Sequence, residues 1–514
     1  MPLGEARAWR FATLFVAPYV LLAMAWLGSN PPGAAPDAGS HLIKALGVAR
    51  LEVGVPYAGP VPAKPLVLVR NASITRVVTV PARLVQPGFT CFAFRPEKTA
   101  DCQPAPKNTP GVVAAATAMG AYPPFVYLPM GLAASAASTT PQAWTYGGAV
   151  VLVETMVLLW LACWHLVRWL GRRALLGVML GVTPLAVFCA GILNTSGLEI
   201  FGALGVASVV AVSTRRPESL ASRGTQAVML VSGSALVLSR QLGIVTMGTL
   251  VVLLLAVGGW QPIWQEVRHG SRLMIATLAL FVVESLAVAG WEVGFDHPAV
   301  TGPWYSLDSI RALSGTWLGI SEQAVGRFGW VDVRMAPWVT SVWLVALAAL
   351  LLWALVRGGL RDRLVVVAMA LGLVILAVVT YATVFYPIQA GLQGRHLVPF
   401  FVFLPVFAGI VVAERMGRRT FAWVVTLTAL VLPSIHFYGL YLNGKRYAVG
   451  LTSGPAWFLP DARWSPPLGW LPWLVLGFVA CVGMLASWVQ IGRTGQSRPT
   501  LVGPPPDLGR LPAR

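Results

Sequence analysis

The sequence predicts an all-α polytopic membrane protein with about twelve transmembrane helices, and its composition indicates this class. Of the 514 residues, 56% are hydrophobic and 11% are charged, whereas soluble globular domains carry about 25% charged residues. Apolar runs recur along the chain and are separated by short arginine clusters, which contribute to a net charge of +18. This distribution follows the positive-inside rule and does not suggest the basic face of a nucleic-acid-binding domain. We therefore expect no nucleic-acid partner.

Each predicted span is an apolar run of roughly the length that crosses about 30 Å of hydrocarbon as a helix. The first run follows Arg7 and Arg10 and has no clear cleavage site after it, so we interpret it as an uncleaved signal anchor. No internal repeat is evident, which weakens a two-fold transporter architecture. In chain order the runs are residues 11–27, 146–167, 174–193, 200–212, 226–238, 243–257, 273–289, 338–355, 364–381, 398–412, 421–436 and 468–489.

The arginine clusters also predict orientation. With the N-terminus in the cytoplasm, every cluster between spans falls on the cytoplasmic side. Residues 111–138 are apolar enough to span, but a crossing there would place the first cluster outside. We therefore expect this proline-containing segment to be interfacial or re-entrant. The clusters are Arg168, Arg172 and Arg173; Arg215, Arg216 and Arg223; Arg268 and Arg272; Arg357, Arg361 and Arg363; and Arg415, Arg418 and Arg419.

This orientation predicts one multi-pass domain over residues 1–490 in the plasma membrane, with both termini cytoplasmic and an extracytoplasmic active face. Residues 29–144 form a large first extracytoplasmic loop with interfacial helices, and residues 290–337 and 437–467 form further external loops. Residues 491–514 include Pro504-Pro505-Pro506 and are expected to be a disordered cytoplasmic tail.

Two of the five cysteines, Cys91 and Cys102, flank a short segment of the first loop. They predict a disulfide-closed hairpin in an oxidising compartment. Two unpaired thiols are the alternative, because spacing alone does not establish a bridge. Cys163, Cys189 and Cys481 lie inside apolar runs and are interpreted as small buried hydrophobic residues.

Scarce ionisable residues gather near the predicted outer boundary of the membrane. Charged groups within spans are costly and mark a pathway or a site by default. Each one alone could instead be a snorkelling or helix-capping residue, but their common side favours a shared cavity. The residues are Asp37, His41, Glu154, Glu199, Arg240, Glu284, Arg395 and His396.

A polar cavity at this boundary suits a lipid-phosphate substrate. Arg395 and Arg240 are candidates to neutralise phosphate oxygens, because arginine can bind phosphate bidentately. Asp37 is the candidate base for an acceptor hydroxyl; its alternative role is to cap a helix over residues 38–53. The chain has no Walker-type phosphate loop, no HExxH zinc pattern and no GxSxG elbow.

Further cavity candidates lie in the loops. His41 and Lys44 are three residues apart and share one face of the predicted helix, which fits an anion-facing stripe, although interfacial packing explains His41 equally well. Tyr122 and Trp330 are candidate aromatic platforms, with an interfacial aromatic belt as the commoner explanation. Asp332, beside Trp330, is a second candidate base.

Several short motifs resemble known membrane proteins. The prolines before Asp37, with His41 and residues 121–127 (AYPPFVY), resemble the first-loop signature of GT-C-type polytopic glycosyltransferases. Residues 194–200 (NTSGLEI), 326–332 (GRFGWVD), 393–399 (QGRHLVP) and 446–450 (RYAVG) look like the actinobacterial membrane proteins grouped as domain-of-unknown-function family 2142. The resemblance covers nearly the whole chain except the tail.

The resemblance implies a GT-C-like fold that uses polyprenyl-phosphate sugars at the extracytoplasmic face, with Asp37 as base or acceptor-orienting group. A second acid usually follows this aspartate in the family, but here the position is Ala38. That departure puts a metal site built on the acid pair in doubt. No cofactor is expected, and a divalent metal is not excluded.

The leading hypothesis is a cell-envelope glycosyltransferase that inverts the anomeric carbon. It transfers a sugar from a polyprenyl-phosphate donor to an envelope glycan, lipid or protein acceptor, with membrane lipids around it. Asp37 and His41 would be catalytic, and Arg395, His396 and Arg240 would bind the departing phosphate. The alternatives are a multi-span transporter or lipid-carrier flippase, favoured by Glu154 and Glu284, and a non-catalytic envelope assembly protein.

Overall fold

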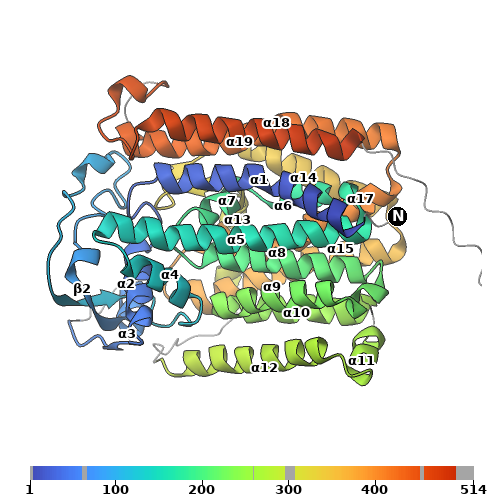
Figure 1. Cartoon of the computed structure of the whole chain (residues 1–514), viewed down its shortest axis with the longest axis horizontal. Helices are drawn as coiled ribbons and strands as arrows, with labels where there is room; N and C mark the ends of the chain where they lie inside the picture. The colour runs from blue at the N-terminus through green and yellow to red at the C-terminus, as the bar shows by residue number, and fades with distance from the viewer. Residues whose placement is uncertain (1–3, 61–65, 259, 296–306, 452–455, 494–514) are drawn as a thin grey trace, which may run out of the picture.

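The structure, a computed structural model, describes residues 4–60, 66–258, 260–295, 307–451 and 456–493. Long helices lie side by side in a bundle, and a smaller region of short helices and strands covers one end (Figure 1). That region contains α2, α3, α4 and β2, whereas α1 begins at the opposite end.

Within the described residues, nine helices are long and apolar enough to cross a membrane. They are α1 (Glu5–Ser29), α5 (Thr140–Leu170), α8 (Ser196–Ser213), α12 (Arg272–Val293), α14 (Pro337–Arg357), α15 (Leu360–Thr380) continued by the π-helical turn η5 (Tyr381–Phe385), α16 (Gly394–Phe401) continued by α17 (Phe403–Arg415), α18 (Arg418–Val449) and α19 (Trp470–Arg493).

The remaining predicted runs are helical but irregular. Residues 174–193 form η3 (Arg172–Leu175), α6 (Leu176–Gly181) and α7 (Pro184–Ala190), with a bend of 84° before α7. Pro184 cannot donate to the preceding turn, and the Thr183 hydroxyl accepts from the Ala186 amide to begin a new helix. Residues 243–257 lie in α10 (Gln241–Gly258), which forms a second bent pair with α11 (Gln261–Arg268). If each bent pair is one span, the described residues contain up to eleven candidate membrane spans. The predicted run 226–238 lies in the 17-residue helix α9 (Arg223–Ser239).

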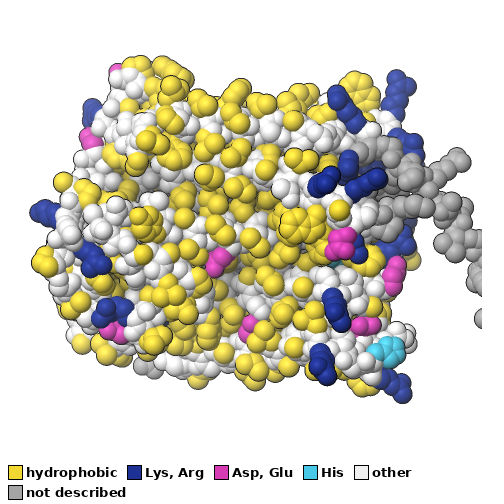
Figure 2. All heavy atoms as spheres, viewed as in Figure 1, with side chains coloured by type: hydrophobic (Ala, Val, Ile, Leu, Met, Phe, Trp, Pro, Cys, Tyr) yellow, Lys and Arg dark blue, Asp and Glu magenta, His cyan; other side chains and the backbone are white. Residues whose placement is uncertain are grey.

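The arginine clusters share the end of the bundle at which α1 begins. Arg168 lies 3.7 Å from Glu5, and the Arg172 guanidinium lies 4.3 Å from the ring centroid of Phe11. At the same end, Arg215 pairs with Glu414 across 3.1 Å. Figure 2 shows lysine and arginine side chains gathered there. The clusters therefore segregate to one end, and the side of the membrane that this end faces stays a prediction.

The centre of the bundle is α8, in which every residue is buried. Glycines allow neighbouring helices to approach closely, as is common between membrane helices. A Cβ at Gly205 of α8 would lie 2.0 Å from the Ser232 hydroxyl of α9, and a Cβ at Gly177 of α6 would lie 2.1 Å from the Pro405 carbonyl oxygen of α17.

The first loop folds into a small region of its own. Its elements are α2 (Ala38–Ala49), β1 (Val55–Pro56), α3 (Leu66–Ile74), β2 (Arg76–Pro81), η1 (Ala82–Leu84), η2 (Ala100–Cys102), β3 (Val112–Thr117) and α4 (Tyr127–Ser135). The strands form an antiparallel sheet in the order β1-β2-β3, with Val77 opposite Val55 and Ala116. The all-α prediction did not include this sheet. Valine favours strands, and β2, which contains three valines, packs against α2.

The apolar segment 111–138 divides into β3 and the nine-residue α4 and is not one long helix; its interfacial or re-entrant position stays a prediction. The predicted disulfide of the first loop is confirmed. Cys91 and Cys102 form a disulfide, with their Cα atoms 6.1 Å apart. Cys163, Cys189 and Cys481 are buried free thiols, as expected.

The other predicted external segments contain more helix than expected. Residues 290–337 include the 20-residue α13 (Leu307–Gly326) and a hairpin of β4 (Arg327–Phe328) and β5 (Val333–Arg334). The predicted loop 437–467 begins inside α18, which continues to Val449, and also contains η6 (Leu459–Asp461). At the tail, α19 extends to Arg493, and residues 494–514 lie outside the described part of the chain.

Candidate functional site

Asp37 lies at the junction between α1 and the first-loop region. It occupies the residue before α2 with a left-handed backbone, φ 60°, and its side chain makes no capping hydrogen bond. The alternative role for Asp37, as a side-chain helix cap, is therefore wrong, and α2 ends at Ala49 rather than at residue 53. Aspartate tolerates this conformation better than most residues, and it leaves the carboxylate 48% exposed and 3.7 Å from a guanidinium nitrogen of Arg395.

Arg395 is on the first turn of α16, where its side chain is only 12% exposed. The turn packs tightly on α13, since a Cβ at Gly394 would lie 2.3 Å from the Ala324 nitrogen. Among the described residues, the Nε of Arg395 has no hydrogen-bond partner. A buried donor without a partner costs about 1–3 kcal/mol, so this nitrogen is prepared for a ligand or an ordered water.

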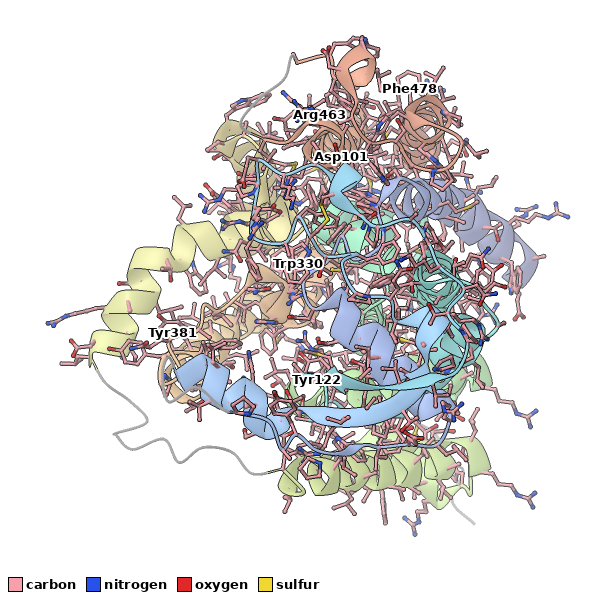
Figure 3. The ribbon with its side chains drawn as sticks, turned by 90° about the vertical axis from the view of Figure 1, so that its left-hand side faces the viewer. Asp101, Tyr122, Trp330, Tyr381, Arg463 and Phe478 are labelled. Atoms are coloured by element: carbon pink, nitrogen blue, oxygen red, sulfur yellow. A yellow bond between two sulfur atoms is a disulfide. The ribbon has the colours of Figure 1, made fainter. Side chains whose placement is uncertain are left out.

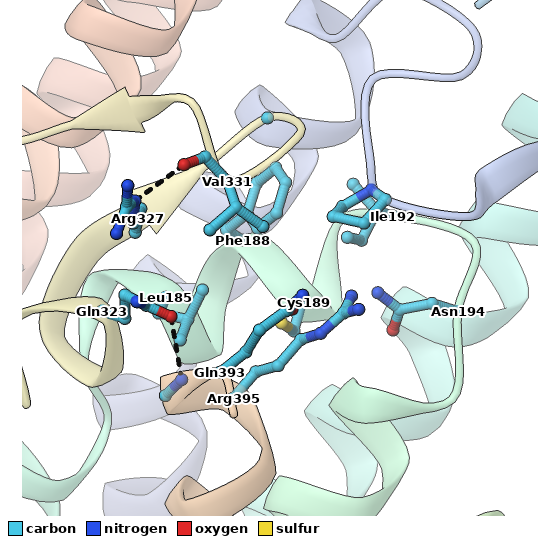
Figure 4. Close-up of a pocket in the computed structure, with 13 residues that line it drawn as sticks. Leu185, Phe188, Cys189, Ile192, Asn194, Gln323, Arg327, Val331, Gln393 and Arg395 are labelled. Atoms are coloured by element: carbon cyan, nitrogen blue, oxygen red, sulfur yellow. Dashed lines mark hydrogen bonds between the residues drawn. The ribbon is translucent and has the colours of Figure 1, made fainter. Parts of the chain in front are cut away.

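Arg395 lines a cavity of about 330 Å³, its open mouth included, which we call the arginine cavity (Figure 4). The Nδ2 of Asn194 and the Oε1 of Gln393 also lack partners among the described residues. In Figure 4 the end of the Arg395 side chain points toward Asn194. The lining residues are Pro36, Leu185, Phe188, Cys189, Ile192, Asn194, Gln323, Arg327, Gly329, Val331, Gln393, Gly394 and Arg395.

Two hydrogen bonds hold the far wall of the arginine cavity. The Arg327 Nε donates to the Val331 carbonyl at 2.7 Å, which closes the β4–β5 turn. The Gln323 Oε1 accepts from the Gly394 amide at 3.2 Å and ties α13 to α16. The cavity thus combines two arginine side chains with amide groups over an apolar floor from α7.

Arg240 lies in a second polar cluster, at the end of α9. Its guanidinium pairs with Glu199 across 3.3 Å and also donates to the hydroxyl groups of Ser196 and Tyr122. Glu199 is completely buried, and one of its oxygens has no partner in the described residues. Because Glu199 balances its charge, Arg240 is less available than Arg395 to a phosphate.

His41 lies close to both arginines. Its Nδ1 is 2.7 Å from the Tyr127 hydroxyl, and its ring packs on those of Tyr127 and Tyr122. Burial, with the positive charges of Arg395 and Arg240, holds the pKa of His41 well below its usual range. His41 is therefore neutral at physiological pH and can exchange a hydrogen bond with Tyr127 without adding charge.

Lys44 shares a face of α2 with His41 but has its own partners. Its ammonium donates to the Gly120 carbonyl at 3.2 Å and lies 4.7 Å from the ring centroid of Trp291. Burial lowers the pKa of Lys44 to about 8. Lys44 therefore anchors α2 and does not line the arginine cavity.

His396 follows Arg395 but points elsewhere. Its ring stacks on Phe385 with centroids 5.1 Å apart, and its Nδ1 accepts from the Gln393 amide at 3.4 Å. This packing fixes the first turn of α16. His396 is placed to orient Arg395, and it does not line the cavity.

Trp330 and Asp332 lie in the β4–β5 turn, whose Gly329 and Val331 line the arginine cavity. The Trp330 indole donates to the Gly33 carbonyl at 2.9 Å, and the Asp332 carboxylate pairs with Arg446 at 2.8 Å. Figure 3, which views this end of the bundle, shows Trp330 near its middle. Both side chains therefore hold the turn beside the cavity.

Glu154 and Glu284 are not part of either cluster. Each has one oxygen without a partner among the described residues, on α5 and α12 respectively, and neither lines the arginine cavity. The structure thus brings Asp37, Arg395, His41 and Arg240 together, and leaves the two span glutamates apart.

The site residues predicted from the sequence did not include Asn194, Gln323, Arg327 or Gln393. Asn194, Arg327 and Gln393 lie within the motifs of residues 194–200, 326–332 and 393–399. The amide or cationic side chain in each motif could have identified them as candidate site residues. In the described part of the chain, no three His, Cys, Asp or Glu side chains group closely enough to hold a metal ion.

Three comparisons place the chain among known proteins. The model of a family described as "Predicted membrane protein (DUF2142)" matches residues 20–404. No curated protein shows significant similarity to the chain. Among solved structures, ArnT from Cupriavidus metallidurans bound to undecaprenyl phosphate matches with 13% identity and a TM-score of 0.45, over 93% of this chain and 76% of that chain. The match is a loose one, so the helix arrangement described above stands on this chain's own contacts.

Proposed function

Because the chain belongs to the DUF2142 family of membrane proteins, we propose from the geometry of its site that it is a glycosyltransferase using a polyprenyl-phosphate sugar. The observation that carries this proposal is the Asp37 carboxylate, 3.7 Å from Arg395 at a cavity with unpartnered donors. A direct displacement needs a base for the acceptor hydroxyl close to a cation for the departing phosphate. Asp37 and Arg395 supply this pair.

Substrate binding frees the base. In the protein without substrate, Arg395 pairs with Asp37. A donor phosphate entering the arginine cavity takes the guanidinium, since arginine binds phosphate bidentately, and the Asn194 amide donates a further hydrogen bond. The Asp37 carboxylate is then released from its ion pair and can face the acceptor hydroxyl.

The transfer is a single displacement. The acceptor hydroxyl gives its proton to the Asp37 carboxylate while its oxygen bonds to the anomeric carbon. The bond between that carbon and the phosphate oxygen breaks, and its electron pair leaves on the polyprenyl phosphate held by Arg395. Attack from the side opposite the leaving group inverts the anomeric carbon.

An apolar cavity that shares helices α13 and α16 with the arginine cavity suits the isoprenoid chain. It measures about 920 Å³, its open mouth included, and most of its lining is apolar residues of α13 to α17. Ala324 and Leu397 line this cavity, whereas Gln323 and Arg395, on the same two helices, line the arginine cavity. Burial of isoprene units in the apolar cavity would contribute roughly 25 cal/mol per Å².

The test is transfer by purified protein in lipid nanodiscs from radiolabelled polyprenyl-phosphate hexoses to an envelope extract. We expect labelled product with the wild type and a loss of about 100-fold or more with Arg395→Gln, because a phosphate-stabilising charge is removed. Arg463→Gln, at an exposed arginine of the same end of the bundle, is the matched control. Movement of the donor across vesicles without a new glycosidic bond would favour the flippase alternative.

A further inference from the structure

A third cavity lies on the other side of the segment that carries Asp37. It measures about 850 Å³, its open mouth included, and its walls include three tryptophans: Trp144 of α5, Trp464, and Trp473 of α19. We call it the tryptophan cavity. Its floor is the segment from Pro31 to Ala35, and Ile192 is shared with the arginine cavity.

The Trp473 side chain is held in place. The Trp473 ring lies against Gly28, where an added Cβ would be 2.3 Å from the nearest ring atom. Its indole nitrogen donates to the Pro467 carbonyl at 2.7 Å. Only a glycine at position 28 allows the ring this position, so the cavity has a rigid aromatic wall.

Two lining residues carry buried donors without a partner among the described residues. They are the Nε1 of Trp144 and the Nδ2 of Asn30, whose Oδ1 accepts from the Asn443 side chain at 2.7 Å; the Oδ1 of Asn443 also lacks a partner among the described residues. Each such donor costs about 1–3 kcal/mol until it meets an acceptor. A ligand that brings hydrogen-bond acceptors would offer these donors partners.

The lining also excludes a charged ligand. No Asp, Glu, Lys, Arg or His is among the described residues that line the tryptophan cavity, so a phosphate or a carboxylate would be buried there without a counter-charge. An isoprenoid chain offers no acceptor to Trp144 or Asn30. A neutral saccharide has flat C–H faces for the indole rings and hydroxyl oxygens for the two donors.

We propose that the tryptophan cavity binds an uncharged sugar unit of the acceptor, so that the acceptor of this enzyme is a glycan. This inference rests on the proposed function for its place in the reaction. Pro36 lines the arginine cavity, Ala38 lines the tryptophan cavity, and Asp37 stands between them. A hydroxyl of a sugar bound among the tryptophans would approach the Asp37 carboxylate from the side opposite the donor phosphate.

Binding without turnover tests the proposal. Protein in nanodiscs is probed by saturation-transfer NMR with neutral trisaccharides of mannose, galactose and glucose. We expect saturation of at least one of them. Trp144→Phe keeps an aromatic ring but removes the N–H, and is expected to weaken that binding about fivefold, the equivalent of one ordinary hydrogen bond.

Trp169→Phe is the matched control. Trp169 is on the same helix and its Nε1 also lacks a partner in the described residues, but it does not line the tryptophan cavity. Saccharide binding that is absent, or equally affected by both substitutions, would overturn the proposal. So would displacement of the trisaccharide by undecaprenyl phosphate to the same extent in the wild type and Arg395→Gln, since the cavity would then hold a lipid chain.

The result for saccharide binding can be told apart from the result for glycosyl transfer. Trisaccharide binding that survives Arg395→Gln supports the saccharide site even if no polyprenyl-phosphate sugar is turned over. Turnover onto a lipid or peptide acceptor, with no saccharide binding, would support the enzyme and remove this acceptor site.

Discussion

The guanidinium of Arg446 donates to the Asp332 carboxylate at 2.8 Å, and its other N–H groups donate to three carbonyls of the disulfide-closed hairpin. Arg446 is completely buried at the end of α18. One side chain thus joins α18, the β4–β5 turn and the hairpin between Cys91 and Cys102. These three segments surround the loop that carries Asp37.

Asp332→Asn is expected to destabilise the protein strongly, because the Arg446 charge would stay buried without its counter-ion. Breaking a buried pair in this way costs about 3–5 kcal/mol. Thermal unfolding in detergent should show a lowered Tm. Asp308→Asn, which breaks an exposed pair with Arg311, is the control and should leave the Tm nearly unchanged.

Asp37→Asn is expected to separate binding from chemistry. The amide keeps the size of the side chain and tolerates the left-handed backbone, but it cannot accept the acceptor proton. Transfer should fall by roughly 100- to 10,000-fold, whereas undecaprenyl phosphate binding should persist or strengthen, because Arg395 loses its negative partner. Unchanged turnover would remove Asp37 from the mechanism.

Lys44 should make stability rise with pH. Burial lowers the pKa of Lys44 from 10.5 to about 8. Between these values the unfolded chain holds the proton and the folded protein does not, so the free energy of unfolding increases as pH rises. The full effect is on the order of 3 kcal/mol. Comparing the Tm at pH 7 and pH 9.5 should show this rise in the wild type and a smaller one in Lys44→Met; equal slopes would contradict it.

Gly177→Ala is expected to disturb the crossing of α6 and α17. The new Cβ would lie 2.1 Å from the Pro405 carbonyl oxygen, so backbone must move, and such overpacking costs about 1–3 kcal/mol. Gly248→Ala on α10 is the matched control, because nothing lies within 4 Å of its Cβ position. A drop in Tm is expected for the first substitution and not for the second.

The helical body could be predicted from the sequence because lipid burial demands long apolar runs. All twelve predicted runs are largely helical. The bend before Pro184 could have been inferred from that proline, whereas α13 could not, because it is too polar for a membrane-spanning run. The small sheet was missed because its strands are short and lie within a loop.

The site was predictable in part. Scarce charges near one boundary pointed to Asp37 and Arg395, which the structure places 3.7 Å apart. The sequence could not reveal that Arg240 is already paired with Glu199, nor that Arg446 is a buried junction. Its carbonyl partners are about 350 positions away in the chain, and no local pattern encodes contacts at that separation.

Because no residue of α8 reaches the surface, this helix is insulated from the bilayer by its neighbours. Its 18 residues span about 27 Å, slightly less than the thickness of a typical hydrocarbon core, yet it pays no penalty for hydrophobic mismatch. Glu199 and Ser196, at its first turn, are thus held at a depth set by protein packing, and the Arg240 cluster should keep its geometry when the protein moves between thinner and thicker membranes.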